Sequence, residues 1–309
     1  MYPLIFNNVY FNKIWGGGMF KHFRDNIVEN SIGESWDLCC HNNAVSIVDN
    51  GIYRGTDLKE LIIRVKEELI GRKLWNDTFD YNDFPYLIKI ISTKDNLSLQ
   101  VHPGDYYAEK NENSNGKLEA WYILDCEENA EIVMGVKDCT VNEFLEACEN
   151  EEAERYLNKV KVSPGDLFVI RPGLIHSIGG NILLAEFQQN SDITYRVYDY
   201  GRGRELHLEK ARDVIDVGLR PYKLSDSDKV FDSTRFRLEL LNIDGCYICE
   251  GDKDICFAIT CVEGQGTITY RYNGKEETLN ISRMDTLLIP SGMEACNING
   301  RMKMVKLGM

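Results

Sequence analysis

A run of seven residues, Leu97 to Pro103, carries polar side chains where a buried strand would normally be apolar. Apolar and polar residues alternate strictly along it, which is the period of a β-strand whose two faces meet different surroundings. We expect one apolar and one polar face, made of Leu97, Leu99 and Val101 against Ser98, Gln100 and His102. The polar face predicts a wet cavity inside a β-structure, and its histidine is a candidate metal ligand.

Two later segments could supply the remaining ligands. In Lys117–Leu124, the alternation places Lys117, Glu119 and Trp121 on one face of a strand. In Val162–Ser177, a histidine follows a Pro-Gly turn. Two imidazoles, one carboxylate and one amide oxygen suit a borderline divalent metal and leave a position open for water or substrate. The candidate ligands are Gln100, His102, Glu119 and His176.

Charge and hydropathy argue against nucleic-acid and membrane partners. The chain has 309 residues and a formal net charge of −14, so its surface repels nucleic acids and anionic lipids. A phosphate-bearing substrate would therefore need a local basic pocket. No apolar run is long enough to span a membrane, and the N-terminal residues lack the order of a signal peptide. We expect a cytoplasmic protein with no nucleic-acid or membrane partner.

The ten cysteines are scattered along the chain and are expected to be reduced, small and buried. Cys246 and Cys249 have CxxC spacing, but they lie in a strand-like run and no second CxxC completes a zinc site. We therefore interpret them as structural. The remaining histidines do not lie in comparable strand motifs with other candidate ligands. We interpret His22, His41 and His207 as structural or surface residues.

Short strands separated by Gly and Pro dominate the chain, which favours a mainly β protein of jelly-roll type over a parallel α/β sheet. Three helices are expected among them. The first covers residues 57–70 with Thr56 as N-cap, the second begins at Thr140 with a capping box, and the third covers Glu209–Val217. Residues 109–116 are expected to form a polar loop.

A weak internal repeat relates residues 162–173 to residues 281–292. Each copy has a turn with an aspartate, an apolar strand and a second turn with proline. The first copy continues to His176, whereas the second continues to Met293 without a histidine. We predict two related β-barrels, residues 1–225 with helical insertions and residues 226–309, of which the second binds no metal. The boundary is expected in the polar run 223–229.

Several motifs, taken in order, resemble one family. They are FPYLIKII, LSLQVHPGD, GKLEAWYIL, RPGLIHSI and NSDITYRVYDYGR, with Trp15-Gly16-Gly17 and Gly33-Glu34-Ser35-Trp36 nearer the N-terminus. Together they resemble the short bacterial form of class I mannose-6-phosphate isomerase (phosphomannose isomerase), a member of the cupin superfamily. The resemblance is dense over residues 84–204 and weak after residue 230.

The resemblance implies an enzyme that interconverts mannose 6-phosphate and fructose 6-phosphate through a cis-enediol, with one Zn²⁺ per chain. Its implied zinc ligands fall on the four candidates already named, and its catalytic arginine falls on Arg196. The chain departs from the family at Leu118, which we expect to point away from the site, and at Cys39-Cys40, for which the sequence offers no interpretation.

Chemical reasoning assigns further roles. Aldose–ketose isomerisation moves a proton between C1 and C2, so it needs an acid–base group and a cation for the developing oxyanion. Lys117 and Asp192 are predicted to be catalytic with Arg196, and the base remains open between Lys117, Asp192 and His102. Ser98 and Arg202 are predicted to bind the phosphate with Arg196.

Two other functions are less consistent with the sequence than an isomerase. Two histidines and a carboxylate also suit an iron(II) oxygenase, but a glutamine ligand and a cationic phosphate site do not. A binding or regulatory cupin without turnover would not need Lys117, Asp192 and Arg196. The sequence allows either a monomer or a homodimer.

Overall fold

The computed structural model describes the whole chain except residues 25–26, 28–30, 77–78, 81–83 and 225–229. The protein is mainly β, with several antiparallel sheets and short helices, as the sequence predicts. Its residues divide into two compact units: residues 1–10, 35–90 and 225–309, and residues 11–34 and 91–224. Strands β2 (Val9–Asn12), β3 (Ile32–Leu38) and β6 (Tyr86–Ser92) each contain residues of both units. Within the described part of the chain, no helix has the length and apolarity needed to cross a membrane.

The second unit is built on two antiparallel arrays. One has the order β10-β9-β12-β7-β14 and the other includes β15-β11-β8-β13. The strands are β7 (Leu99–Val101), β8 (Glu119–Cys126), β9 (Glu131–Val136), β10 (Leu157–Lys161), β11 (Leu167–Ile170), β12 (His176–Ile178), β13 (Ile182–Gln189), β14 (Tyr195–Tyr198) and β15 (Tyr222–Lys223). Apolar side chains from both arrays form one buried cluster, which includes Trp121, Phe168, Met134 and Ile178.

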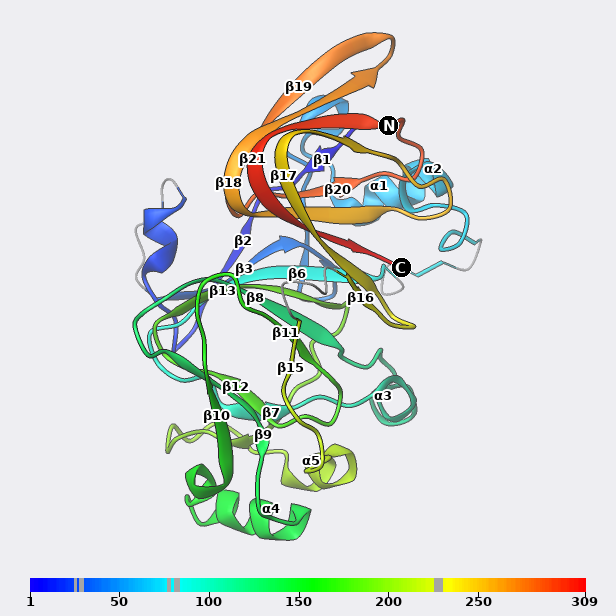
Figure 1. Ribbon diagram of the computed structural model, residues 1–309. Coiled ribbons are helices and arrows are strands. Elements are labelled where there is room, and N and C mark those ends of the chain that lie inside the picture. Colours follow the sequence, from blue (N-terminus) through cyan, green and yellow to red (C-terminus); the bar gives the residue numbers. More distant parts are fainter. Residues whose placement is uncertain (25–26, 28–30, 77–78, 81–83, 225–229) are drawn as a thin grey trace. The chain divides into compact units, whose positions relative to one another are not determined.

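Short helices accompany these strands: η1 (Met19–His22), α3 (Asp105–Glu112), α4 (Val141–Glu149), η4 (Ala153–Tyr156) and α5 (Leu208–Val214). Helices α4 and α5 cover the face of the β7 array that points away from β8 (Figure 1). Phe144 and Leu145 of α4 pack there against Leu99 and Val101. The predicted capping box is confirmed, because the Thr140 hydroxyl accepts from Glu143 N and the Glu143 carboxylate accepts from Thr140 N.

The first unit contains one large antiparallel sheet of order β1-β20-β18-β21-β17-β16, with β19 paired to β18. Its elements are β1 (Leu4–Ile5), β4 (Cys40–His41), β5 (Ala44–Val45), η2 (Gly51–Tyr53), α1 (Leu58–Val65), α2 (Glu67–Ile70), β16 (Val230–Asp232), β17 (Arg237–Cys249), β18 (Phe257–Tyr272), β19 (Lys275–Ser282), β20 (Thr286–Ile289) and β21 (Cys296–Gly308). Cys249 lies directly opposite Cys296 in the β17–β21 ladder.

Three local expectations are wrong. The first predicted helix is two helices, because Lys66 has a φ of 54° between them, and its N-cap is Asp57, whose carboxylate accepts from Glu60 N. The expected loop at 109–116 begins inside α3, which starts at Asp105. Leu97 precedes β7 and packs in the cluster between the arrays, away from Leu99 and Val101. Here tertiary packing outweighs the local pattern. The predicted boundary at residue 225 lies outside the described residues and stays a prediction.

Candidate metal centre

A row of side chains crosses the β7 array at one level. Gln100 of β7 lies directly opposite His176 of β12 on one side and Arg196 of β14 on the other. Directly opposed residues of antiparallel strands point to the same face of a sheet. Strand pairing therefore gathers these three side chains, which are 96 residues apart at the extremes of the sequence.

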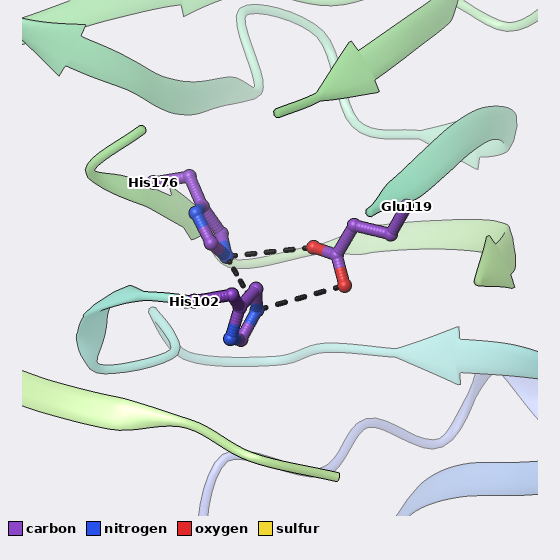
Figure 2. Close-up of side chains that lie close together, drawn as sticks. All are labelled: His102, Glu119 and His176. Carbon is purple, nitrogen blue, oxygen red and sulfur yellow. Dashed lines mark hydrogen bonds and ion pairs between the residues drawn. The ribbon is translucent and has the colours of Figure 1, made fainter. Parts of the chain in front are cut away.

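Glu119 begins β8, and its carboxylate meets the imidazoles of His102 and His176 (Figure 2). Glu119 Oε2 lies 3.6 Å from His102 Nε2, and Glu119 Oε1 lies 3.4 Å from His176 Nε2. The two Nε2 atoms are 3.1 Å apart. All three side chains are buried, and their possible ligand atoms lie within 4.8 Å of one another.

Backbone carbonyls orient both imidazoles. His102 Nδ1 lies 2.8 Å from Ile193 O, and His176 Nδ1 lies 2.8 Å from Leu174 O. A carbonyl oxygen can only accept, so each Nδ1 carries the proton and each Nε2 keeps its lone pair. This is the usual outer-shell arrangement of metal-binding histidines. A turn links the two, because Gly173 N–H donates to His102 O (2.9 Å) with Gly173 at a φ of +89°, a conformation that favours glycine.

The geometry fits a cation. Two lone pairs 3.1 Å apart repel each other unless a positive charge lies between them. Metal–ligand bonds of about 2.0–2.2 Å in a tetrahedral site place neighbouring ligand atoms about 3.3–3.6 Å apart. The separations of 3.1, 3.4 and 3.6 Å here are close to that range. These residues can therefore hold a divalent metal in their present arrangement.

Gln100 lies beside this group, with its Nε2 placed 3.2 Å from His176 Nε2. In this orientation the amide donates to the imidazole lone pair. Since the two ends of a glutamine amide have nearly the same shape, a half-turn about its last bond would present Oε1 instead. Gln100 is thus within reach as a fourth ligand, which stays a prediction.

Lys117 adds a positive charge. Its Nζ lies 2.9 Å from Glu119 Oε2 and 3.2 Å from His102 Nε2. Burial alone would lower the pKa of Lys117, but the carboxylates of Glu119 and Glu186 outweigh it and leave the pKa raised. Lys117 is therefore an ammonium at neutral pH in this site.

The other groups respond to the same surroundings. Burial, followed by the charge of Lys117, lowers the pKa of His102 to about 3. Burial also lowers the pKa of His176. Burial would raise the pKa of Glu119, but Lys117 and His102 hold it well below its usual range. At neutral pH the site therefore presents two neutral imidazoles and one carboxylate, the protonation states that metal binding requires.

The comparisons with known proteins identify the family of this chain. The family described as "Phosphomannose isomerase type I, catalytic domain" matches residues 4–148. The mannose-6-phosphate isomerase ManA of Bacillus subtilis (strain 168) is 35% identical over 314 residues, which is 96% of each chain. The chain belongs to the type I phosphomannose isomerase family. This confirms the family that the motifs predict.

Two further similarities support membership. The mannose-6-phosphate isomerase of Streptococcus mutans serotype c is 32% identical over 318 residues, covering 98% of this chain and 97% of the relative. A crystal structure of the mannose 6-phosphate isomerase from Bacillus subtilis superposes with a TM-score of 0.87 at 30% identity and covers 100% of both chains. The fold and the family are therefore shared over the full length.

The other predicted residues lie at different depths. Ser98 is buried just before β7, and Arg196 is half-buried, with Nη1 donating to Glu205 O (2.8 Å). Arg202 is engaged with Asn96 O (2.7 Å) and with Asp199. Asp192 is exposed in the loop between β13 and β14. Ser98 and Arg196 therefore border the row of ligands more directly than Arg202 and Asp192.

Sequence reasoning missed two buried polar residues of β13. Glu186 lies opposite Trp121 and accepts from its Nε1–H (3.0 Å), and Gln188 lies opposite Glu119. The Gln188 amide donates to Gln189 O and Ser191 O, which holds the end of β13. The signal that singled out Gln100 and His102 was present here too. Glu186 and Gln188 alternate with apolar residues in the strand ILLAEFQQ, and Gln189 follows them.

Proposed function

We propose that this chain interconverts D-mannose 6-phosphate and D-fructose 6-phosphate through a cis-enediol intermediate, using one zinc ion per chain. The observation that carries the proposal is the convergence of His102, Glu119 and His176 in a chain of this family. We further propose Gln100 as the fourth ligand. When bound, zinc would supply Lewis acidity toward the sugar's carbonyl and hydroxyl oxygens.

The protein's own residues would handle proton and charge. Lys117 has a raised pKa and would begin the reaction as an ammonium, with its Nζ 3.2 Å from His102 Nε2. It is therefore suited to donate a proton to a sugar oxygen. Arg196 stays cationic and flanks Gln100, so it suits the negative charge that develops on the enediol oxygens. Asp192 remains a candidate for the base, whereas His102 is a poor one because its lone pair would bind the metal.

We propose that Ser98, Arg196 and Arg202 hold the phosphate, in a protein of net charge −14 that needs a local basic site. Arg202 and Arg204 both form ion pairs with Asp199. These three residues together carry one net positive charge, in addition to the charge of Arg196.

The fold is proposed to comprise two cupin-type jelly-roll barrels, residues 1–225 and 226–309, the second lacking a metal. The shared turn structure of the internal repeat supports this proposal. A cytoplasmic location and a monomeric or homodimeric state remain predictions.

Metal analysis of the purified protein, combined with a coupled assay on mannose 6-phosphate, tests the function. We expect stoichiometric zinc, loss of turnover after chelation and recovery on adding zinc. Absence of turnover in fully zinc-loaded protein would contradict the proposed isomerase function. Oxygen consumption by the iron(II)-loaded protein would instead favour the oxygenase.

One variant separates binding from chemistry. Arg196→Ala should keep its zinc and lose about 10²–10³-fold in kcat/KM, because a transition-state charge would lose its partner. Arg196→Lys is the matched control, since it keeps the charge without the planar fork. A near-normal rate for Arg196→Ala would show that the assigned role is wrong.

A further inference from the structure

Arg196 is fastened to a short downstream segment at three points. Its backbone N–H donates to His207 Nδ1 (3.1 Å), and its backbone carbonyl accepts from His207 N–H (2.7 Å). Its Nη1 donates to Glu205 O (2.8 Å). Both ends of one arginine, backbone and guanidinium, therefore depend on residues 205–207.

The contact to His207 specifies one protonation state. Because Nδ1 accepts a proton from Arg196 N–H, the ring must be neutral with its own proton on Nε2. A protonated imidazole carries hydrogens on both nitrogens and cannot accept. Protonation would therefore place two N–H groups against each other and break the contact.

Several charged groups surround this ring. Glu205 precedes it, Lys210 follows on α5, Arg196 faces it from β14, and Glu112 lies on α3. The Tyr195 ring is 6.3 Å away, centroid to centroid. Burial is the largest influence and lowers the pKa of His207, against the charge of Glu205, which raises it. The neutral ring thus prevails at physiological pH.

The segment that delivers His207 is held at its start. Asp199 pairs with Arg202 and with Arg204, and Arg202 also donates to Asn96 O. The chain then reverses through positive φ values at Gly201 (72°) and Gly203 (74°). A loop that is anchored at Asp199 and ends in helix α5 can present His207 in a defined position.

We propose that His207 is a positioning residue for Arg196, and that its neutral Nδ1, with the Glu205 carbonyl, holds the guanidinium in the ligand row. This rests on the proposed function of Arg196 at the isomerase centre. It also predicts an acid limb in the kcat profile, caused by protonation of His207 and release of Arg196. Sequence reasoning interpreted His207 only as a structural or surface residue.

The kinetic test compares His207→Asn with His207→Leu. The asparagine Oδ1 can replace Nδ1 as an acceptor but does not titrate, whereas leucine offers no acceptor. At pH 8 we expect His207→Leu to lose about 10–100-fold in kcat, because small misplacements of a catalytic group are costly. Its zinc content and unfolding midpoint should match those of the surface control His22→Leu. His207→Asn should recover most of the rate and lack the acid limb.

A second measurement does not need turnover. In protein labelled with ¹⁵N-arginine, the Arg196 amide signal, assigned through Arg196→Lys, should shift as pH falls below about 6.5 in the wild type. It should not shift in this way in His207→Asn. An Arg196 signal that ignores pH in the wild type, or a normal kcat for His207→Leu, would overturn the proposal. Absence of wild-type turnover would reject the isomerase alone, since the amide signal still decides the positioning.

Discussion

The turns at residues 163–166 and 282–285 share one backbone design and lead to different chemistry. In the first, Ser163 N–H donates to Asp166 Oδ2 (3.1 Å), and in the second, Ser282 N–H donates to Asp285 Oδ2 (2.7 Å). The third residue of each has a positive φ, 95° at Gly165 and 75° at Met284. The weak sequence repeat therefore corresponds to a repeated local structure.

The strands that follow also correspond. β11 lies beside β8, as β20 lies beside β18, and each central strand is flanked on its other side by a later strand. Ile170 of β11 is opposite Glu119, whereas the matching Ile289 of β20 is opposite Phe257. The position that carries a candidate-ligand carboxylate in one unit carries a buried aromatic ring in the other.

The second turns diverge in the same way. The turn after β11 leads to His176, while three residues after Gly292 the second copy has Ala295. A scaffold of strands and Asp turns can therefore be kept while its interior changes from a candidate metal site to an apolar core. Ligand chemistry depends on two or three inward positions, and the turns do not specify it.

The largest expected effect concerns the divergent position. His176→Ala should lose bound zinc and at least about 10³-fold in kcat/KM, because one ligand of the cation is removed. The matched change beside the equivalent position, Glu294→Ala, should alter neither. Metal analysis and the coupled assay measure both. Reduced zinc in Glu294→Ala would break the comparison.

Glu119 and Phe257 occupy corresponding positions in the two units, and substitutions there should differ in their effect on metal binding. Glu119→Gln should abolish zinc binding, and it should also lower stability because the buried Lys117 Nζ, 2.9 Å from Glu119 Oε2, loses that carboxylate. Phe257→Ala should leave zinc bound but destabilise by about 3–5 kcal/mol, because it removes a buried ring. Urea unfolding and metal analysis distinguish the two. Zinc lost from Phe257→Ala, or zinc retained by Glu119→Gln, would contradict the comparison.

The stability of the metal-free protein should depend on pH because of the buried His102. The pKa of His102 is about 3, below the value of about 6.5 for an unfolded histidine. The unfolded state therefore binds the proton first, and stability should fall as pH drops below about 6.5, by up to about 1.4 kcal/mol per pH unit. Urea unfolding of the chelated protein should show this slope flattened in His102→Gln. An unchanged slope would contradict the assignment.

The smallest effect should be shared by both copies. Asp166→Ala and Asp285→Ala each remove a carboxylate acceptor from a serine N–H, so each should cost about 1 kcal/mol. Thermal unfolding measures them. A much larger loss in one copy would mean that the two turns are not equivalent.

Much of the site could be predicted from sequence because side-chain direction along a strand is a local property. The alternation around Gln100 and His102, and the pairing of Lys117 with Glu119 on one face, needed no tertiary information. The capping box at Thr140 is equally local, since its donors and acceptors are three residues apart.

Only the tertiary structure determined which residues lie opposite one another on neighbouring strands. Register placed Arg196 and His176 on either side of Gln100, set Gln188 against Glu119, and brought His207 back to Arg196. Leu97 turned toward the cluster between the arrays although its own pattern assigns it to the opposite face. Register and packing depend on contacts among residues far apart in the chain, and a local period of two residues cannot encode which distant strand lies alongside.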